Sequence, residues 1–173
     1  MMRNIIKILV IAVPFITITG FSGQDFTYVG AVKCKKCHRA PQRGNQYQAW
    51  LDSRHNKSYA VLSSLSALEE AKKENLTTPP NESPQCLKCH SPLYEKALDL
   101  ITQGVTCEVC HGPGSAYTKM SIMKNKEKAV QNGLVVYASQ EAIKEKCMAC
   151  HTDEHFNFAA SWEEIEHPVP SKQ

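Results

Sequence analysis

The motif Cys-x-x-Cys-His occurs four times in this chain of 173 residues and uses all 8 cysteines. On a helical turn, residues i, i+3 and i+4 lie on one face, so the two thiols and the imidazole of each copy point the same way. This arrangement is typical of covalent haem attachment. The thiols form thioethers to one porphyrin, and the His binds its iron from one side.

The motifs therefore predict which residues hold four haem c groups. The predicted attachment residues are Cys34, Cys37, Cys86, Cys89, Cys107, Cys110, Cys147 and Cys150. The predicted proximal iron ligands are His38, His90, His111 and His151. Zinc bound by paired Cys-x-x-Cys units and disulfides are the alternatives, but neither requires a His directly after the second Cys in every copy.

Four haems constrain the fold because only about 150 residues remain after the N-terminal segment. We predict one domain, residues 23–173, in which the haems themselves form much of the core. The fold class is mainly α: a compact multihaem cytochrome of short helices and loops around closely packed haems, with little or no sheet. Apolar periodicity predicts helices over 45–51, 58–75 and 116–131, and a further helix that begins at Ser139. The second and third motifs are close in sequence, so we expect their haems to be neighbours.

Residues 1–22 have the pattern of a signal peptide. A short positive start precedes an apolar run over residues 5–18, and small residues at Gly20 and Ser22 favour cleavage after Ser22. The predicted location is periplasmic or secreted. The alternative is a retained membrane anchor, although this run is shorter than the roughly 20 apolar residues of a spanning helix and contains Lys7 and Pro14.

The charge balance gives no indication of nucleic-acid binding. The full chain has 20 basic and 17 acidic residues. Residues 1–22 contain two of the basic residues, Arg3 and Lys7, which leaves 18 against 17 in the mature chain. Haem propionates would move the net charge of the oxidised protein to about −3.

Seven histidines cannot fill the eight axial positions of four haems. Three remain after the proximal set, so at most three haems have two His ligands within one chain. The distal candidates are His55, His155 and His167, with Met120 and Met123 as further candidates on the apolar stripe of residues 116–131. The alternatives are a solvated His155 beside acidic neighbours, and methionines that only pack.

Several stretches outside the motifs resemble the tetrahaem cytochrome c-554 family (the cytochrome c-554 and c-prime group). The matching stretches are Tyr28-Val29-Gly30, Trp50-x-x-Ser53-x-His55, the run from Gly104 to Gly114, and Trp162-x-x-Ile165-x-His167. The resemblance covers nearly the whole mature chain.

The resemblance implies stacked haem pairs, three haems with two His ligands and one five-coordinate haem. It implies that His55 is the distal ligand of the third-motif haem and His167 that of the fourth, and that the haem of His90 is open. Relatives often have a distal His after Gly-Pro-Gly, but residues 115–120 contain none. The sixth ligand of the first haem is therefore His155, Met120, Met123 or nothing.

The function that these features predict is electron transfer between redox partner proteins, with no nucleic-acid partner and with membrane association only through the N-terminal segment. A basic stretch around the first motif and an acidic C-terminal segment are candidate docking surfaces. One alternative is an enzyme that reduces a nitrogen oxide at an open haem. The other is a subunit of a membrane complex or of a haem-to-haem oligomer.

Overall fold

A computed structural model describes residues 25–167 of the chain. The predicted signal peptide, residues 1–22, lies outside this range, as do residues 168–173. The described part is helical and contains no strand, which confirms the predicted mainly α class. None of its helices is long and apolar enough to cross a membrane.

The helices are short and follow one another through turns. The α-helices are α1 (Ala31–His38), α2 (Gln46–Asp52), α3 (Arg54–Lys57), α4 (Leu65–Lys73), α5 (Pro84–His90), α6 (Cys107–His111), α7 (Met120–Met123), α8 (Lys126–Gln131), α9 (Gln140–Met148) and α10 (Phe158–Ile165). The 3-10 helices are Pro41–Arg43, Ala60–Ser63 and Leu98–Gln103.

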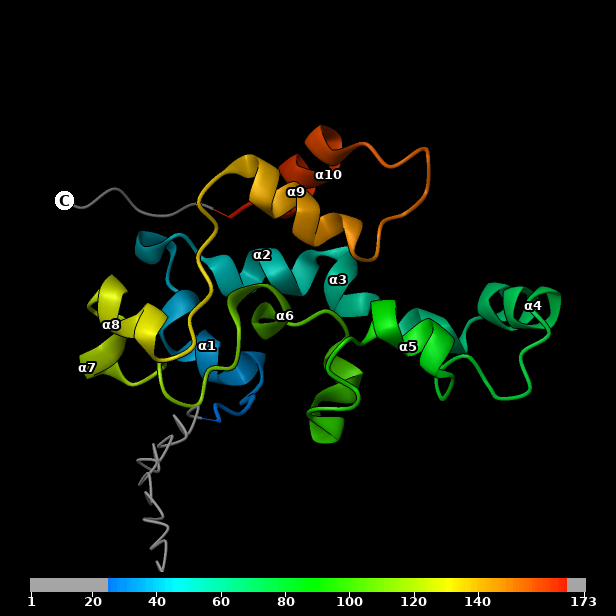
Figure 1. Ribbon diagram of the computed structural model, residues 1–173, viewed down its shortest axis with the longest axis horizontal. Coiled ribbons are helices and arrows are strands. Elements are labelled where there is room, and N and C mark those ends of the chain that lie inside the picture. Colours follow the sequence, from blue (N-terminus) through cyan, green and yellow to red (C-terminus); the bar gives the residue numbers. More distant parts are fainter. Residues whose placement is uncertain (1–24, 168–173) are drawn as a thin grey trace, which may run out of the picture.

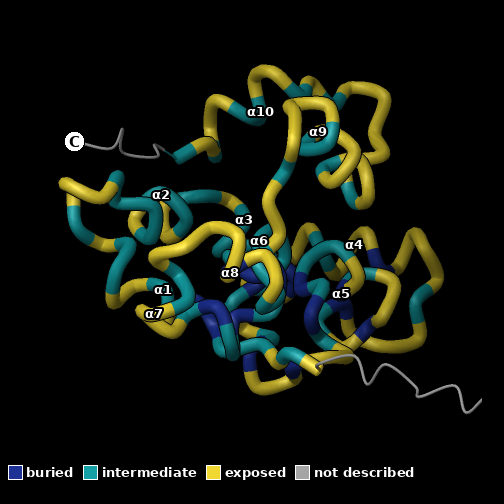
Figure 2. Tube along the Cα trace, turned by 60° about the vertical axis from the view of Figure 1, so that its left-hand side comes forward, coloured by how far each residue is buried: buried dark blue, intermediate teal, exposed yellow. Residues whose placement is uncertain are grey.

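Helices α2, α3 and α6 occupy the middle of the molecule, as Figure 1 shows. Helices α1, α7 and α8 lie at one end, and α4 and α5 lie towards the other. Helices α9 and α10 lie together along one side of this row, and the rotated view in Figure 2 shows the same arrangement. The first and last attachment motifs therefore lie on different sides of the central helices.

Two of the predicted helices are each interrupted. The range 58–75 divides into the 3-10 helix at residues 60–63 and α4, because Ser64 is extended and its hydroxyl caps α4 by accepting the N–H of Ala67. The range 116–131 divides into α7 and α8, because the Asn125 side chain accepts the N–H of Lys128. An N-cap inside an apolar pattern begins a new helix.

The predicted helix start at Ser139 is confirmed. The Ser139 hydroxyl caps α9 by accepting the N–H of Ala142 at 3.2 Å. Helix α6 ends at His111, and the following Gly112 has a φ of 78°, in the region that favours glycine. A Cβ at Gly112 would also clash with the carbonyl oxygen of Gly133, so both the backbone conformation and the space at this position require glycine.

The hydrophobic core of the described residues is small. Only nine hydrophobic residues are buried, and four of them are alanines. One cluster joins Leu93, Ala97 and Leu100, against which Tyr28 and Val109 pack. Figure 2 shows that most of the chain is intermediate or exposed. A domain with so little buried side-chain volume fits a fold stabilised by covalently attached groups.

Candidate haem sites

Each attachment motif lies at the C-terminal end of a helix. Helices α1, α5 and α6 end at His38, His90 and His111, so their three motif residues share a helical face. The fourth motif differs, because α9 ends at Met148 and the following turn carries Cys150 and His151. The N–H of His151 still bonds to the carbonyl of Cys147 at 3.0 Å, which preserves the helical spacing of that motif.

All eight cysteines are free thiols of intermediate burial. They form no disulfide, and residues 25–167 contain no cluster of three or more His, Cys, Asp or Glu side chains able to hold a metal ion. Free, accessible thiol pairs followed by an imidazole are the donor set that covalent haem requires. The residues present therefore fit haem c.

Contacts between thiols show which motifs are neighbours. A hydrogen bond between Cys34 and Cys107 lowers the pKa of the Cys34 thiol and raises that of Cys107. Burial and a hydrogen bond to Cys89 raise the pKa of Cys150 to about 11. The first motif thus lies against the third, and the second against the fourth. The sequence led us to expect the second and third motifs to be neighbours, but the thiols that touch join other pairs.

A third link joins these two pairs. Burial raises the pKa of the Cys110 thiol, and the charge of a neighbouring Cys147 thiolate would raise it further. Cys110 belongs to the third motif and Cys147 to the fourth. The motifs therefore form a continuous row in the order first, third, fourth, second.

Two pairs of imidazoles face each other. The ring centres of His55 and His151 are 6.1 Å apart, and those of His111 and His167 are 6.0 Å apart. Two imidazoles that bind one metal ion from opposite sides have ring centres about 6 Å apart, since each metal–nitrogen bond is about 2 Å long. Both pairs have the spacing of the two axial ligands of one haem iron.

The ring contacts differ from the pairing that the family resemblance implied. His55 faces the fourth-motif His151, not His111 of the third motif. His167 faces the third-motif His111, not His151 of the fourth. Helix α10 lies beside α9 (Figure 1), and the chain after α10 brings His167 to His111 at the end of α6. His55, within α3, meets His151 in the turn that follows α9.

In each pair, the surroundings of one imidazole favour its neutral form, the form that binds metal. Burial lowers the pKa of His55, and the nearby His151 lowers it further. Burial also lowers the pKa of His111, with His167 acting in the same direction.

His155 and the two methionines lie apart from these pairs. The His155 ring is exposed, and its Nε2 lies 3.6 Å from a carboxylate oxygen of Glu154. This is the solvated alternative that the sequence left open. Met120 is 51% exposed on α7, and Met123 lines a hollow beside Lys126 and Leu134. In the described range, no ring contact joins His38 or His90 to another imidazole.

The sequence did not identify the residues that orient the first two proximal histidines. His90 Nδ1 lies 2.8 Å from the carbonyl oxygen of Ser58, and His38 Nδ1 lies 3.2 Å from the amide oxygen of Gln46. A hydrogen bond at Nδ1 leaves Nε2 free for iron and fixes the plane of the ring. Ser58 is 32 residues from His90, so no local pattern indicates this contact.

Ser58 also packs tightly against the chain before the third motif. Its hydroxyl accepts the N–H of Val105 at 3.1 Å and can donate to the carbonyl of His55 or of His90. Gly104, at φ 64°, allows this approach, because a Cβ there would meet the Ser58 hydroxyl at 2.5 Å. One short segment, residues 55–58, therefore connects the second, third and fourth motifs.

Comparison with known proteins agrees with the site. Residues 33–112, which contain the first three motifs, match a family described as cytochrome c554 and c-prime. This segment belongs to that family. The chain is also 29% identical to "Cytochrome c-554" of Nitrosomonas europaea over 171 residues, which cover 87% of this chain and 69% of that protein. No solved structure gives a significant match.

These two matches confirm the resemblance to the cytochrome c-554 family that the sequence motifs indicated. They support a c-type cytochrome with covalently bound haem c, a role in electron transfer and redox partner proteins.

Proposed function

We propose that this protein is an exported carrier that holds four haems in one row and moves single electrons between redox partners. The observation that carries this proposal is the set of interactions between thiols. Hydrogen bonds join the first motif to the third and the second to the fourth, and a charge effect between neighbouring thiols joins the third to the fourth. Bound haem iron supplies the one-electron couple. The polypeptide attaches the haems side by side, binds the iron and excludes water around it.

The two facing imidazole pairs support two bis-His haems, those of the third and fourth motifs. Iron that already has six ligands exchanges electrons without exchanging a ligand, which suits a carrier. These two haems occupy the middle of the row, so an electron that crosses the protein passes through both.

Two oppositely charged surfaces are the proposed docking sites. Val32, Lys35, Lys36 and Arg39 surround a shallow hollow on the outer side of α1, opposite the haem-binding side of that helix. Helix α10 and the residue after it carry three exposed acidic residues, Glu163, Glu164 and Glu166. Such charges steer partners of opposite sign and fix their orientation. Two separate docking surfaces would let the carrier bind its donor and its acceptor at the same time.

The test of this proposal is a haem count on the purified, matured full chain. Mass spectrometry should give the mass of the polypeptide plus four haems, and the haem should resist acid–acetone extraction. Substitution of Cys86 and Cys89 together by Ala should leave three haems. Bound zinc, or haem that extracts freely, would overturn the proposal.

A second measurement tests export. If residues 1–22 are a signal peptide, the recovered protein should begin near Gly23 and appear in the periplasmic or secreted fraction. Membrane association that ends only when residues 1–22 are deleted would show the retained anchor instead.

A second candidate function is binding or reduction of a small ligand at an open haem. It is favoured by the position of His90, whose Nδ1 bonds to Ser58 while no imidazole faces its ring. Turnover of an oxidised nitrogen compound with an electron donor, abolished by a ligand that blocks the open iron, would establish this enzyme activity. Ligand binding without turnover would leave the protein a carrier.

A further inference from the structure

A buried carboxylate lies between the first and third attachment motifs. Glu108, the residue after Cys107 in the third motif, is 1% exposed. One carboxylate oxygen accepts the N–H of Gly114 at 2.7 Å, and the other accepts the N–H of Gly30 at 2.7 Å. The N–H of Val29 is 3.0 Å from both oxygens. The carboxylate thereby holds the segment before α1 and the loop after α6 against each other.

These contacts are those of an ionised carboxylate. An ionised carboxylate is only an acceptor, whereas a protonated one also needs an acceptor for its own hydrogen. All three partners of the Glu108 side chain are backbone N–H donors. The ion pairs found in residues 25–167 involve other acidic residues, so no Lys, Arg or His side chain neutralises this charge there. Glu108 is a negative charge held in the interior by peptide dipoles alone.

The field of this charge reaches both neighbouring motifs. The charge of Glu108 acts to raise the pKa of Cys34 in the first motif and of Cys107 in the third. It has the same effect on the buried hydroxyl of Tyr117, whose pKa is raised mainly by burial. Cys34 and Cys107 touch each other, so the edges of the first and third haems would meet beside this carboxylate.

We propose that Glu108 sets the reduction potentials of the first and third haems. A haem loses one unit of positive charge when it is reduced, so a fixed negative charge nearby favours the ferric form. Burial increases this effect, because the charge is poorly screened away from water. Glu108 keeps the first and third haems harder to reduce than they would otherwise be. This shift favours electron transfer from this pair to the fourth and second haems.

The inference rests on the proposed four-haem carrier, and its test uses the haem-loaded full chain. Glu108→Gln removes the charge while nearly preserving the shape of the side chain. A spectroelectrochemical titration should show two of the four haems shifted to higher potential, with the equilibrium constant for reduction increased at least tenfold, or about 59 mV for one electron. The other two haems should keep their potentials.

Two further variants separate the charge from the structural role. Glu69→Gln removes an exposed carboxylate on α4, and its charge is screened by water, so all four potentials should stay unchanged. Glu108→Asp keeps the charge but shortens the reach to the N–H donors. If charge sets the potentials, the Asp variant should keep the two low potentials that the Gln variant loses.

The possible results are distinct. Unchanged potentials in Glu108→Gln with four haems attached would overturn this inference alone. Equal shifts in the Gln and Asp variants, or loss of attached haem in both, would assign Glu108 to folding only and also overturn it. Absence of four covalent haems from the unaltered protein would overturn the proposed function instead.

Discussion

At the scale of single residues, the chemistry depends on histidines that come from distant parts of the chain. His55 and His151 are separated by 96 positions in the sequence, yet their rings face each other at 6.1 Å. His111 and His167 do so at 6.0 Å. In each pair one member belongs to an attachment motif, and the other has no motif to indicate its partner. In the proposed assignment, this second member is the distal ligand, and its presence sets the spin state of the haem.

Replacing either distal histidine should change one haem only. His55→Ala should convert the fourth-motif haem from low spin to high spin, and His167→Ala should do the same to the third, because loss of an imidazole weakens the ligand field. Electron paramagnetic resonance measures both changes. His155→Ala is the control and should leave the spectrum unaltered, since that ring is exposed beside Glu154. A spin change in the control, or none in the other two variants, would contradict these assignments.

Tyr137 should make stability depend on alkaline pH. Its hydroxyl donates to the carbonyl of Cys110 at 2.9 Å, and burial raises its pKa to about 12, above the ordinary value of about 10. Because the folded state holds the proton more tightly, this contribution is complete below about pH 10 and is lost as the pH rises towards 12. Tyr137→Phe should remove that loss. Urea midpoints at about pH 8 and about pH 11.5 measure it, and an identical decline in both proteins would exclude Tyr137 as its source.

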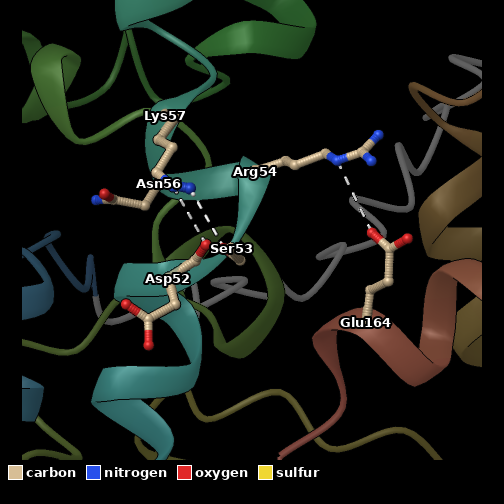
Figure 3. A network of polar contacts seen from close by, with 6 residues as sticks. All are labelled: Asp52, Ser53, Arg54, Asn56, Lys57 and Glu164. Carbon is tan, nitrogen blue, oxygen red and sulfur yellow. Dashed lines mark hydrogen bonds and ion pairs between the residues drawn. The ribbon is translucent and has the colours of Figure 1, made fainter.

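At the scale of elements, short helices are held by caps and by few contacts with one another. Figure 3 shows this where α3 begins, because the Ser53 hydroxyl accepts the N–H of Asn56. The same hydroxyl donates to the carbonyl of Trp50 at 2.7 Å. In the same view Arg54 extends to Glu164 of α10, with 3.9 Å between Nε and the carboxylate oxygen. This ion pair links α3, which contains His55, to α10, which precedes His167.

These two neighbours should differ in their effect on stability. Ser53→Ala removes a cap and should lower the free energy of unfolding by about 1 kcal/mol. Arg54→Ala removes an ion pair between two exposed side chains and should change it by less than about 0.5 kcal/mol. Denaturant unfolding of the haem-loaded protein compares them directly. A larger loss in the Arg54 variant would show that the link to α10 is stronger than an exposed pair.

At the scale of the whole molecule, the number of histidines limits how the haems are ligated. The chain has seven imidazoles for the four irons of the proposed haems. Four form the two facing pairs, two others are proximal ligands without a facing ring, and His155 lies beside Glu154. The proposed first and second haems are therefore the two without an imidazole, among residues 25–167, that faces their proximal histidine. They are also the two ends of the proposed row.

Carbon monoxide should bind the reduced protein with a stoichiometry of one or two. The second haem should bind it, and the first should bind it only if neither Met120 nor Met123 occupies the iron. If one of these methionines binds the first haem, replacing both by Leu should raise the stoichiometry from one to two. If neither binds it, the stoichiometry should be two both before and after the replacement. Optical titration with the gas measures this count. No binding, or more than two equivalents, would contradict the ligand assignments.

The attachment residues could be predicted from the amino-acid sequence, because that chemistry is local. Two thiols and an imidazole at i, i+3 and i+4 meet on one turn whatever the rest of the chain does. The same locality accounts for the confirmed helix start at Ser139 and for the break after His111, where a glycine and a proline follow. Ser64 and Asn125 are local signals as well, but apolar periodicity on both sides of them led to the prediction of single long helices.

Which imidazole faces which motif histidine depends on the tertiary structure and could not be predicted from the sequence. The partners of His55 and His167 depend on how α3 and α10 lie against α9 and α6, and contacts across such distances leave no periodic trace in the sequence. The same holds for Glu108, because no sequence pattern indicates that its carboxylate is buried. Two N–H groups from before the first motif and one from after the third surround it in the folded chain. A covalent motif is determined within five residues, whereas a ligand pair or a buried charge is determined by the packing of the whole chain.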